Sequence, residues 1–463
     1  MKTTDMTCKF TDNITESVVS EPQIDLFRET PTENLEVKKI VGAYQEFENN
    51  FPIKVINQKQ FNTPVNFKQA KAFPRHRWYT YKEGYSPQLV ENFIKRFSKA
   101  ETDIVFDPFG GIGTTVLQSA ILNHQAYSND INPLSNYVAL VKADSYSEKD
   151  VEALNLTSSS LMQATLTLSA LPPINETVTS YFTTETLDSI LKIKNWIEEI
   201  EITKIKNIFS IAFLTILETI STHRKDGNGV KRKTNDKQNF TIDKIKILIA
   251  NQIHLFIVDI QNTSIKVNPV IQHQSSFEPY TLKQKADLVI TSPPYANCFD
   301  YSKVYLIELW FGGFFKSLID QRIFRQSSIT SHVHYKWEKR HQEFGHSFMN
   351  DEIAPYLGTL NLWDKKIPSM LIGYFSDMGK VLSELIPNLN KTATVGIVVG
   401  NSVYGGVPIA TDILLAQIAM RLGFELVGIE SYRTLTPSSQ QLKIMREEDK
   451  KYLRESLIIL KWN

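Results

Sequence analysis

Apolar residues change their spacing several times along this chain, and the changes predict alternating strands and helices. Residues 87–97, PQLVENFIKRF, carry apolar side chains at helical spacing. A short apolar run at 103–106 predicts a strand, 116–123 predicts a helix, and 125–128 predicts a second strand. A strand, a glycine-rich turn, a helix and a strand in this order predict a βαβ unit.

The pattern becomes mostly helical between residues 136 and 265 and returns to alternation afterwards. Residues 316–368 are irregular, basic and aromatic. Helices are predicted at 184–202, 206–222, 242–260, 304–311, 370–385 and 410–422, and strands at 264–271, 286–291, 394–399, 425–430 and 456–461. Strands that alternate with helices predict an α/β fold, with a mainly parallel sheet covered by helices on both faces.

Composition narrows the class of protein. Of the 463 residues, 42% are hydrophobic and 22% are charged, which is typical of a globular protein. We find no apolar run long enough for a transmembrane helix and no signal peptide pattern. Cys8 and Cys298 form no CxxC pair, which favours a reducing, cytoplasmic location. The net charge of +1 does not indicate a nucleic-acid-binding protein, although basic residues can cluster locally.

The first candidate site is the turn after the predicted strand at 103–106. Gly110, Gly111 and Gly113 allow close approach of the backbone to a ligand, and the following helix presents free N–H groups. Asp130 ends the next strand, where a carboxylate can accept hydrogen bonds from ribose hydroxyls. A dinucleotide-binding dehydrogenase is the competing interpretation, but Val116 stands where its third small residue belongs.

The second candidate site is Ser-Pro-Pro-Tyr, residues 292–295, after the predicted strand at 286–291. The two prolines remove two backbone donors, so carbonyl groups and the Ser292 hydroxyl form a pocket rich in acceptors. Tyr295 adds a flat aromatic face. Such a pocket suits an amino group on a planar ring, and the carboxyl edge of an α/β sheet is where ligands bind. A rigid turn with a packed tyrosine is the alternative.

Together, DPFGGIGTT at 107–115 and TSPPY at 291–295 resemble the cofactor and catalytic motifs of the amino-methyltransferases of DNA. The resemblance implies a class I methyltransferase, Rossmann-like fold with a seven-stranded sheet, and S-adenosyl-L-methionine as cofactor. It implies a catalytic set of Ser292, Pro293, Pro294 and Tyr295. The cofactor-binding residues that it implies are Asp107, Pro108, Phe109, Gly110, Gly111, Gly113, Thr114, Thr115, Asp130, Trp78, Tyr79, Gln274 and Ser275.

The resemblance also implies a reaction: transfer of a methyl group to the exocyclic amino group of a base flipped out of double-stranded DNA. Ser at position 292, rather than Asp or Asn, favours cytosine-N4 in this family; adenine-N6 and an RNA amino group are the alternatives. Many relatives with Ser-Pro-Pro-Tyr carry the catalytic motif first, whereas here it follows the cofactor motif. A role in restriction–modification or defence, with a cognate restriction enzyme as partner, is implied by the family alone.

The resemblance divides the chain around a single catalytic domain. We expect a polar N-terminal extension with one or two short helices at 1–70, a cofactor-binding half at 71–135, a mostly helical insertion at 136–265, and a catalytic half at 266–315 and 369–463. The insertion at 316–368 is the candidate for target recognition. The residues expected to contact DNA are Arg224, Lys225, Lys231, Arg322, Arg325, Lys336, Trp337, Lys339 and Arg340.

The sequence lacks the residues that carbon methylation and metal binding would need. Methylation of cytosine carbon needs a cysteine nucleophile, usually after proline, and Cys8 and Cys298 follow Thr and Asn. Four histidines between 332 and 346 have no paired cysteines or acids at ligand spacing, so we expect no metal. A non-catalytic binding module would not need the Ser-Pro-Pro-Tyr motif. The recognised DNA sequence and the oligomeric state stay open.

Overall fold

A mixed, mostly parallel sheet forms the centre of the computed structural model, which describes residues 35–56, 67–82, 84–168, 175–227, 229–234, 239–335, 337, 339–436 and 444–463. Its strand order is β1-β11-β12-β8-β7-β2-β3-β6. The strands are β1 (Lys54–Val55), β2 (Val105–Asp107), β3 (Ala126–Asp130), β6 (Val270–His273), β7 (Ala286–Thr291), β8 (Leu389–Gly400), β11 (Glu425–Thr434) and β12 (Arg454–Trp462).

The sheet confirms the expected α/β fold and differs from it in one detail. Neighbouring strands from β8 to β6 are parallel, and β12 runs antiparallel to both β8 and β11. There are eight strands rather than seven, because β1 pairs in parallel with the edge strand β11. The chain order reverses beside β2, with β3 on one side and β7 on the other, and ligands of α/β sheets bind at such a point.

Alternate side chains of each strand pack against helices on opposite faces of the sheet. Leu457 and Ile459 of β12 join a core with α3 (Pro87–Phe97) and α4 (Thr114–Ile121). Ile458 and Leu460 point to the opposite face, which α15 (Ile367–Leu385) and α16 (Thr411–Arg421) cover. Strands buried on both faces explain the nearly continuous apolar runs in the sequence.

The first described helix, α1 (Leu35–Asn50), belongs to this core, which differs from the polar extension expected at 1–70. Its buried residues Val37, Ile40, Val41, Tyr44 and Phe47 follow helical spacing and pack in the cluster of α15 and α16. The polar majority of the N-terminal sequence hid this stripe. Residues 1–34 and 57–66 lie outside the described part of the chain.

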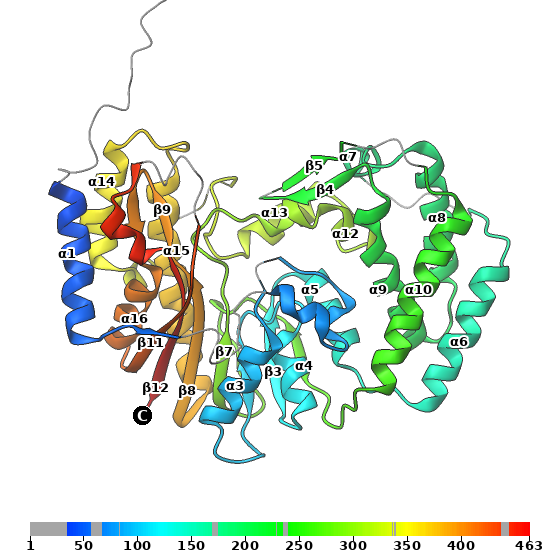
Figure 1. Cartoon of the computed structure of the whole chain (residues 1–463), viewed down its shortest axis with the longest axis horizontal. Helices are drawn as coiled ribbons and strands as arrows, with labels where there is room; N and C mark the ends of the chain where they lie inside the picture. The colour runs from blue at the N-terminus through cyan, green and yellow to red at the C-terminus, as the bar shows by residue number, and fades with distance from the viewer. Residues whose placement is uncertain are drawn as a thin grey trace, which may run out of the picture.

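Most of the helices between residues 136 and 265 group at the other end of the molecule (Figure 1). The central one, α9, contributes ten residues to a second core. The elements are α5 (Pro133–Ala143), α6 (Glu148–Gln163), α7 (Glu176–Thr179), α8 (Thr184–Glu198), α9 (Thr203–Ile220), α10 (Ile242–Gln261) and the hairpin β4 (His223–Asp226) and β5 (Gly229–Arg232).

A buried carboxylate joins the helical region to the catalytic domain. Asp259 on α10 accepts hydrogen bonds from the backbone N–H of Arg75 at 2.8 Å and from the Trp78 indole at 3.0 Å. It also forms an ion pair with Arg77. Trp78 stacks on Phe256 of α10 with ring centroids 4.4 Å apart.

The segment 316–368 is more ordered than the sequence indicated. It contains α13 (Leu318–Gln326), the 3₁₀ turn η3 (Gln342–Phe344), the π-helical turn η4 (Met349–Ile353) and α14 (Ala354–Thr359). Ile329, Val333, Met349, Ile353 and Leu357 are buried in the core of α15 and α16.

The short elements complete the described fold. They are η1 (Phe67–Ala72), η2 (His76–Trp78), α11 (Tyr301–Val304), α12 (Leu306–Phe311), η5 (Ile386–Asn388), β9 (Ser402–Tyr404), β10 (Val407–Ile409) and η6 (Glu447–Tyr452). Among the described helices, none is both long enough and apolar enough to cross a membrane.

Candidate active site

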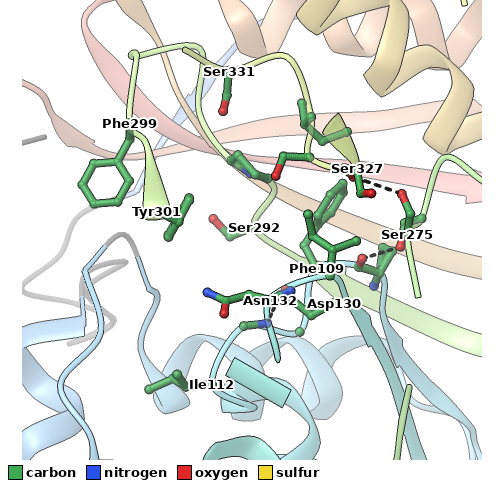
Figure 2. A pocket seen from close by; sticks show the side chains of 18 of the residues that line it. Phe109, Ile112, Asp130, Asn132, Ser275, Ser292, Phe299, Tyr301, Ser327 and Ser331 are labelled. Atoms are coloured by element: carbon green, nitrogen blue, oxygen red, sulfur yellow. Dashed lines mark hydrogen bonds between the residues drawn. The ribbon is translucent and has the colours of Figure 1, made fainter. Parts of the chain in front are cut away.

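A cavity of about 90 Å³ lies at the carboxyl ends of β2, β3, β6 and β7. Its walls come from segments far apart in the sequence (Figure 2). The lining residues include Tyr81, Gly84, Tyr85, Pro108, Phe109, Gly110, Gly111, Ile112, Thr114, Asp130, Asn132, Gln274, Ser275, Ser276, Phe277, Ser292, Pro294, Phe299, Asp300, Tyr301, Ser327, Ser328, Ser331 and His332. The cavity therefore joins the glycine turn with the Ser-Pro-Pro-Tyr segment.

The glycine turn is built so that backbone lines the cavity. Gly111 has φ of +49° and Gly113 has φ of +80°, a region that favours glycine. A Cβ at Gly110 would lie 2.6 Å from Cβ of Ser128, and one at Gly113 would lie 2.7 Å from Cβ of Ala139. Gly110 and Gly111 line the cavity, whereas Gly113 packs the turn against α5.

Asp130 holds the turn from the end of β3. Its carboxylate accepts hydrogen bonds from the backbone N–H of Gly111 at 2.8 Å and of Asn132 at 2.7 Å. Burial raises the pKa of Asp130 to about 6, against the lowering effect of these hydrogen bonds. Asp130 and Asn132 lie together at the cavity wall (Figure 2). A carboxylate there can accept hydrogen bonds from a diol.

Asp107 lies below the cavity floor rather than in its lining. It accepts hydrogen bonds from the hydroxyls of Tyr85 at 2.8 Å, Thr115 at 2.7 Å and Thr291 at 2.6 Å. Burial raises the pKa of this carboxyl, against these hydrogen bonds and that of Phe109 N–H. Asp107 and Thr115, expected to bind the cofactor, thus join the cofactor turn to the strand that carries the second motif.

The segment after β6, which includes Gln274 and Ser275, forms another wall. The backbone N–H of Gln274 donates to the carbonyl of Asp130 at 3.2 Å. Ser276 donates to the carbonyl of Pro108, and Phe277 adds a buried ring. Gln274 and Ser275 line the cavity, and so do Ser276 and Phe277.

The Ser-Pro-Pro-Tyr segment divides between two cavities. Ser292 and Pro294 line the first cavity, whereas Pro293 is buried and lines neither described cavity. Tyr295 faces a second cavity of about 310 Å³. Its hydroxyl lies 3.3 Å from that of Ser292 and donates to Glu455 Oε1 at 2.7 Å.

The expectation for Trp78 and Tyr79 is wrong. Both side chains are buried in the core with the helical region, where the Trp78 indole donates to Asp259. Tyr81 and Tyr85, a few residues later, line the cavity instead. The aromatic residues of this segment indicated that it lies near the cofactor. The sequence does not indicate which of their rings face the cavity and which face the core.

The cavity also has walls that sequence reasoning missed. Phe299, Asp300 and Tyr301 follow the Ser-Pro-Pro-Tyr segment, and residues 327–332 come from the second insertion. Figure 2 shows Ser292 near Tyr301 and, on the far side, Ser331. Asp300 follows Tyr295 by only a few residues, and this short separation was the sequence signal that could have placed it at the cavity.

Three of the residues expected to contact DNA are half-buried and paired with buried acids. Lys225 pairs with buried Glu308, Arg325 pairs with Asp300 at 2.9 Å, and Arg340 pairs with Asp377 at 2.9 Å. Because these charges are already compensated, we correct their assignment as phosphate contacts.

The remaining basic positions differ in exposure. Arg224, Lys231, Arg322 and Lys339 are exposed, and Lys231 lies 3.5 Å from Asp226. Trp337 is half-buried and donates to the carbonyl of His332. Lys336 lies outside the described residues.

A nucleoside with a charged amino-acid tail fits the cavity. The amide nitrogen of Asn132 is buried there without a hydrogen-bond partner, so the wall offers an unsatisfied donor beside the Asp130 carboxylate. Phe109, Phe277 and Tyr301 add flat faces for a base. Among the described residues, no cluster of three or more histidines, cysteines or acids could hold a metal ion.

Comparison with known proteins agrees with this site. A family model described as DNA methylase, for N6 and N4 methyltransferases, matches residues 17–142. The Type II methyltransferase M.BsoBI of Geobacillus stearothermophilus is 27% identical over 85% of this chain and 87% of its own. M.AvaI of Nostoc sp. is 28% identical over 85% and 88%, and M.MvaI of Kocuria varians is 22% identical over 74% and 80%.

Solved structures resemble the chain only loosely. TrmN from Thermus thermophilus aligns with a TM-score of 0.28 and 8% identity, over 86% of this chain and 52% of its own. The fold assignment rests instead on the strand order, with one reversed strand and the glycine turn at the switch point. This is a class I methyltransferase fold, and S-adenosyl-L-methionine is the methyl donor. The family model and these Type II methyltransferases support the assignment of this chain to the amino-methyltransferases of DNA.

Proposed function

We propose that this protein is a site-specific DNA methyltransferase that methylates the exocyclic amino group of a flipped cytosine. One observation carries the proposal: the glycine turn with Asp130 and the Ser292 hydroxyl line the same cavity. A donor and an acceptor of a methyl group can therefore meet there without passing through solvent.

The cavity walls suggest a role for each cofactor-binding residue. Asp130 would accept the ribose hydroxyls, and Gly110 and Gly111 would let the tail lie against backbone. Residues 274–277 would flank the adenine. Bound S-adenosylmethionine supplies a methyl group on a sulfonium centre, whose sulfur is a good leaving group. The protein then contributes mainly alignment and electrostatics.

Ser292 would hold the amino group of the target. Its hydroxyl and the neighbouring carbonyls accept the two amino hydrogens, which draws the nitrogen lone pair out of conjugation with the ring. Ser rather than Asp or Asn at this position supports cytosine over adenine. Because the amino group is paired and stacked in duplex DNA, the base must leave the helix before it reaches Ser292.

The exposed basic residues support a DNA path across both insertions. Arg224 and Lys231 lie on the hairpin β4–β5, and Arg322 lies on α13. The hairpin contacts α11, which in turn contacts α13, so these elements form one continuous region beside the cavity. We propose that the helical insertion at 136–265 contacts phosphates and that 316–368 reads bases.

The relatives support a biological setting. M.BsoBI and M.AvaI are named as Type II methyltransferases, and each aligns with more than four fifths of this chain. We propose that this chain acts on double-stranded DNA within a restriction–modification or defence system, beside a cognate restriction enzyme.

The test is expression in a bacterial host that lacks DNA methylation, followed by sequencing that identifies modified bases. N4-methylcytosine at every copy of one short sequence is the expected result. N6-methyladenine at such a site would overturn the assignment to cytosine, and modified RNA with unmodified DNA would overturn the substrate class. The S292A variant serves as the control for methylation that arises from the host.

A further inference from the structure

Two buried side chains, Asp300 and His332, have no role in the function proposed above. Both line the same cavity as Ser292, and each is at most 3% exposed. They come from different segments: Asp300 precedes α11, and His332 follows α13 in the second insertion. Nε2 of His332 lies 4.0 Å from Oδ1 of Asp300.

Asp300 is held in place as an anion. Oδ1 accepts hydrogen bonds from the backbone N–H of Ser302 at 3.0 Å and from its hydroxyl at 2.6 Å, and Oδ2 accepts from Arg325 at 2.9 Å. Burial opposes its ionisation, but His332, Arg325 and the Ser302 hydroxyl hold the pKa of Asp300 below its ordinary value. Its oxygens are therefore occupied and its charge persists.

His332 is held as a neutral ring. Burial lowers its pKa to about 4, and the charges of Arg325, His334 and Lys303 act in the same direction, against the raising effect of Asp300. Nδ1 is buried and has no hydrogen-bond partner. Buried polar atoms in proteins usually have a hydrogen-bond partner. A ligand that binds transiently in the cavity would supply the partner that Nδ1 lacks.

The proposed reaction creates a need for a proton acceptor. When the amino nitrogen takes the methyl group, a nitrogen–carbon bond forms, the carbon–sulfur bond breaks with its electron pair left on sulfur, and the nitrogen retains one proton too many. Such a nitrogen is strongly acidic, so a weak base is sufficient to accept the proton. Ser292 carries no charge and cannot serve as a stable acceptor.

We propose that the His332 ring accepts this proton and that Asp300 is a positioning residue that stabilises the resulting imidazolium. The proton then passes from the ring to solvent once the product leaves. This inference rests on the proposed function and deepens it, and it holds for the amino group of either cytosine or adenine. Arg325 keeps the dyad oriented through Asp300 and the Ser302 hydroxyl.

The first test compares single-turnover methyl transfer by the wild type and by H332N. We expect H332N to be slower by roughly 10²–10³-fold, with its calorimetric affinity for S-adenosylmethionine changed less than twofold. H334N is the matched control, because His334 is a neighbouring exposed histidine outside the cavity lining. Imidazole added to H332A is expected to restore part of the lost rate.

The second readout does not depend on activity. NMR titration of the free protein, with the His332 signal identified by its absence from H332N, is expected to give a pKa near 4. In D300N that pKa is expected to fall further, because a negative charge beside the ring is lost.

The outcomes separate the two proposals. A wild type that methylates no nucleic acid contradicts the proposed function. An active wild type with an equally active H332N contradicts the proton-acceptor role alone. A slow H332A whose rate imidazole does not restore also contradicts this role. So does a His332 pKa that is the same in D300N as in the wild type.

Discussion

Two aspartates beside the glycine turn show how surroundings set the role of a carboxyl group. Asp107 is surrounded by hydroxyl donors below the cavity, so its oxygens are engaged by the protein itself. Asp130 receives only backbone N–H groups and lies at the cavity wall. The first therefore acts as a structural junction, and the second remains able to bind a ligand.

Cofactor affinity should depend on pH through Asp130. Burial raises its pKa to about 6, and only the ionised form accepts two ribose hydrogen bonds, so affinity is full above pH 6 and falls as pH decreases below it. We expect a loss of up to about tenfold per pH unit, measured by calorimetry with S-adenosylmethionine. D130N should bind weakly at every pH, and E91Q on α3 should follow the wild type. A pH-independent wild-type affinity would refute this role.

Tyr295 should matter for transfer but not for cofactor binding, because it lies outside the cavity lining and is anchored by Glu455. Y295A, which removes the stacking face, should reduce single-turnover methyl transfer by about 10²-fold, in line with a loss of about 1–3 kcal/mol of base stacking. Y295F keeps the ring and should stay within tenfold of the wild type. Equal activity of Y295A and the wild type would exclude base stacking on this ring.

At the scale of single residues, the sequence predicted the positions within the two motifs better than positions outside them. Gly110, Gly111 and Ser292 belong to strings whose chemistry is local. Trp78 and Lys225 were misplaced because their partners, Asp259 and Glu308, lie 181 and 83 residues away. No local pattern reveals whether an aromatic ring or a cation already has a buried partner.

Among the elements, α4 depends on the glycine that begins it. Gly113 adopts φ of +80° at the N-cap, and its α-carbon approaches α5 so closely that a Cβ would collide with Ala139. The fit between α4 and α5 thus fixes the backbone of the cofactor turn.

The variant G113A should destabilise the protein by at least about 2 kcal/mol, from left-handed strain and the collision with α5. G227A is the matched control: Gly227 also has positive φ, at +50°, but nothing lies within 4 Å of its Cβ, so we expect about 1 kcal/mol. Urea unfolding measures both. Equal losses would show that the collision at Ala139 does not contribute.

The joint between the helical region and the sheet should be costly to break. D259N removes the charge that Arg77 and the Trp78 indole share, and loss of one partner of a buried ion pair costs about 3 kcal/mol. E198Q, which removes the exposed pair with Lys194, should cost less than about 0.5 kcal/mol. Similar unfolding midpoints for D259N and E198Q would contradict a joint centred on Asp259.

Long elements with strong periodicity were predicted closely, and short or mixed ones were not. The predicted helix at 87–97 coincides with α3, and the predicted strand at 286–291 coincides with β7. The predicted strand at 264–271 shifts to Val270–His273, because the neighbouring strand β3 selects which residues pair. Short helices were expected within 1–70, but the place of α1 in the core was not, because its buried stripe lies within a polar sequence.

For the whole molecule, the order of motifs along the chain matters less than where they meet. The cofactor turn and the Ser-Pro-Pro-Tyr segment are separated by more than 170 residues and still line one cavity, because β2 and β7 are adjacent parallel strands. The sequence predicted this meeting from strand ends alone. It could not predict that 327–332 closes another wall, since only tertiary packing brings that insertion back.

The most direct test of the account uses the purified protein, tritiated S-adenosylmethionine and unmethylated double-stranded DNA of diverse sequence, followed by digestion to nucleosides and mass spectrometry. The account predicts N4-methyldeoxycytidine with the wild type, formed about 10²-fold more slowly with Y295A. N6-methyldeoxyadenosine in its place would contradict the assignment to cytosine, and 5-methyldeoxycytidine, or methyl groups only in RNA, would contradict the proposed function itself.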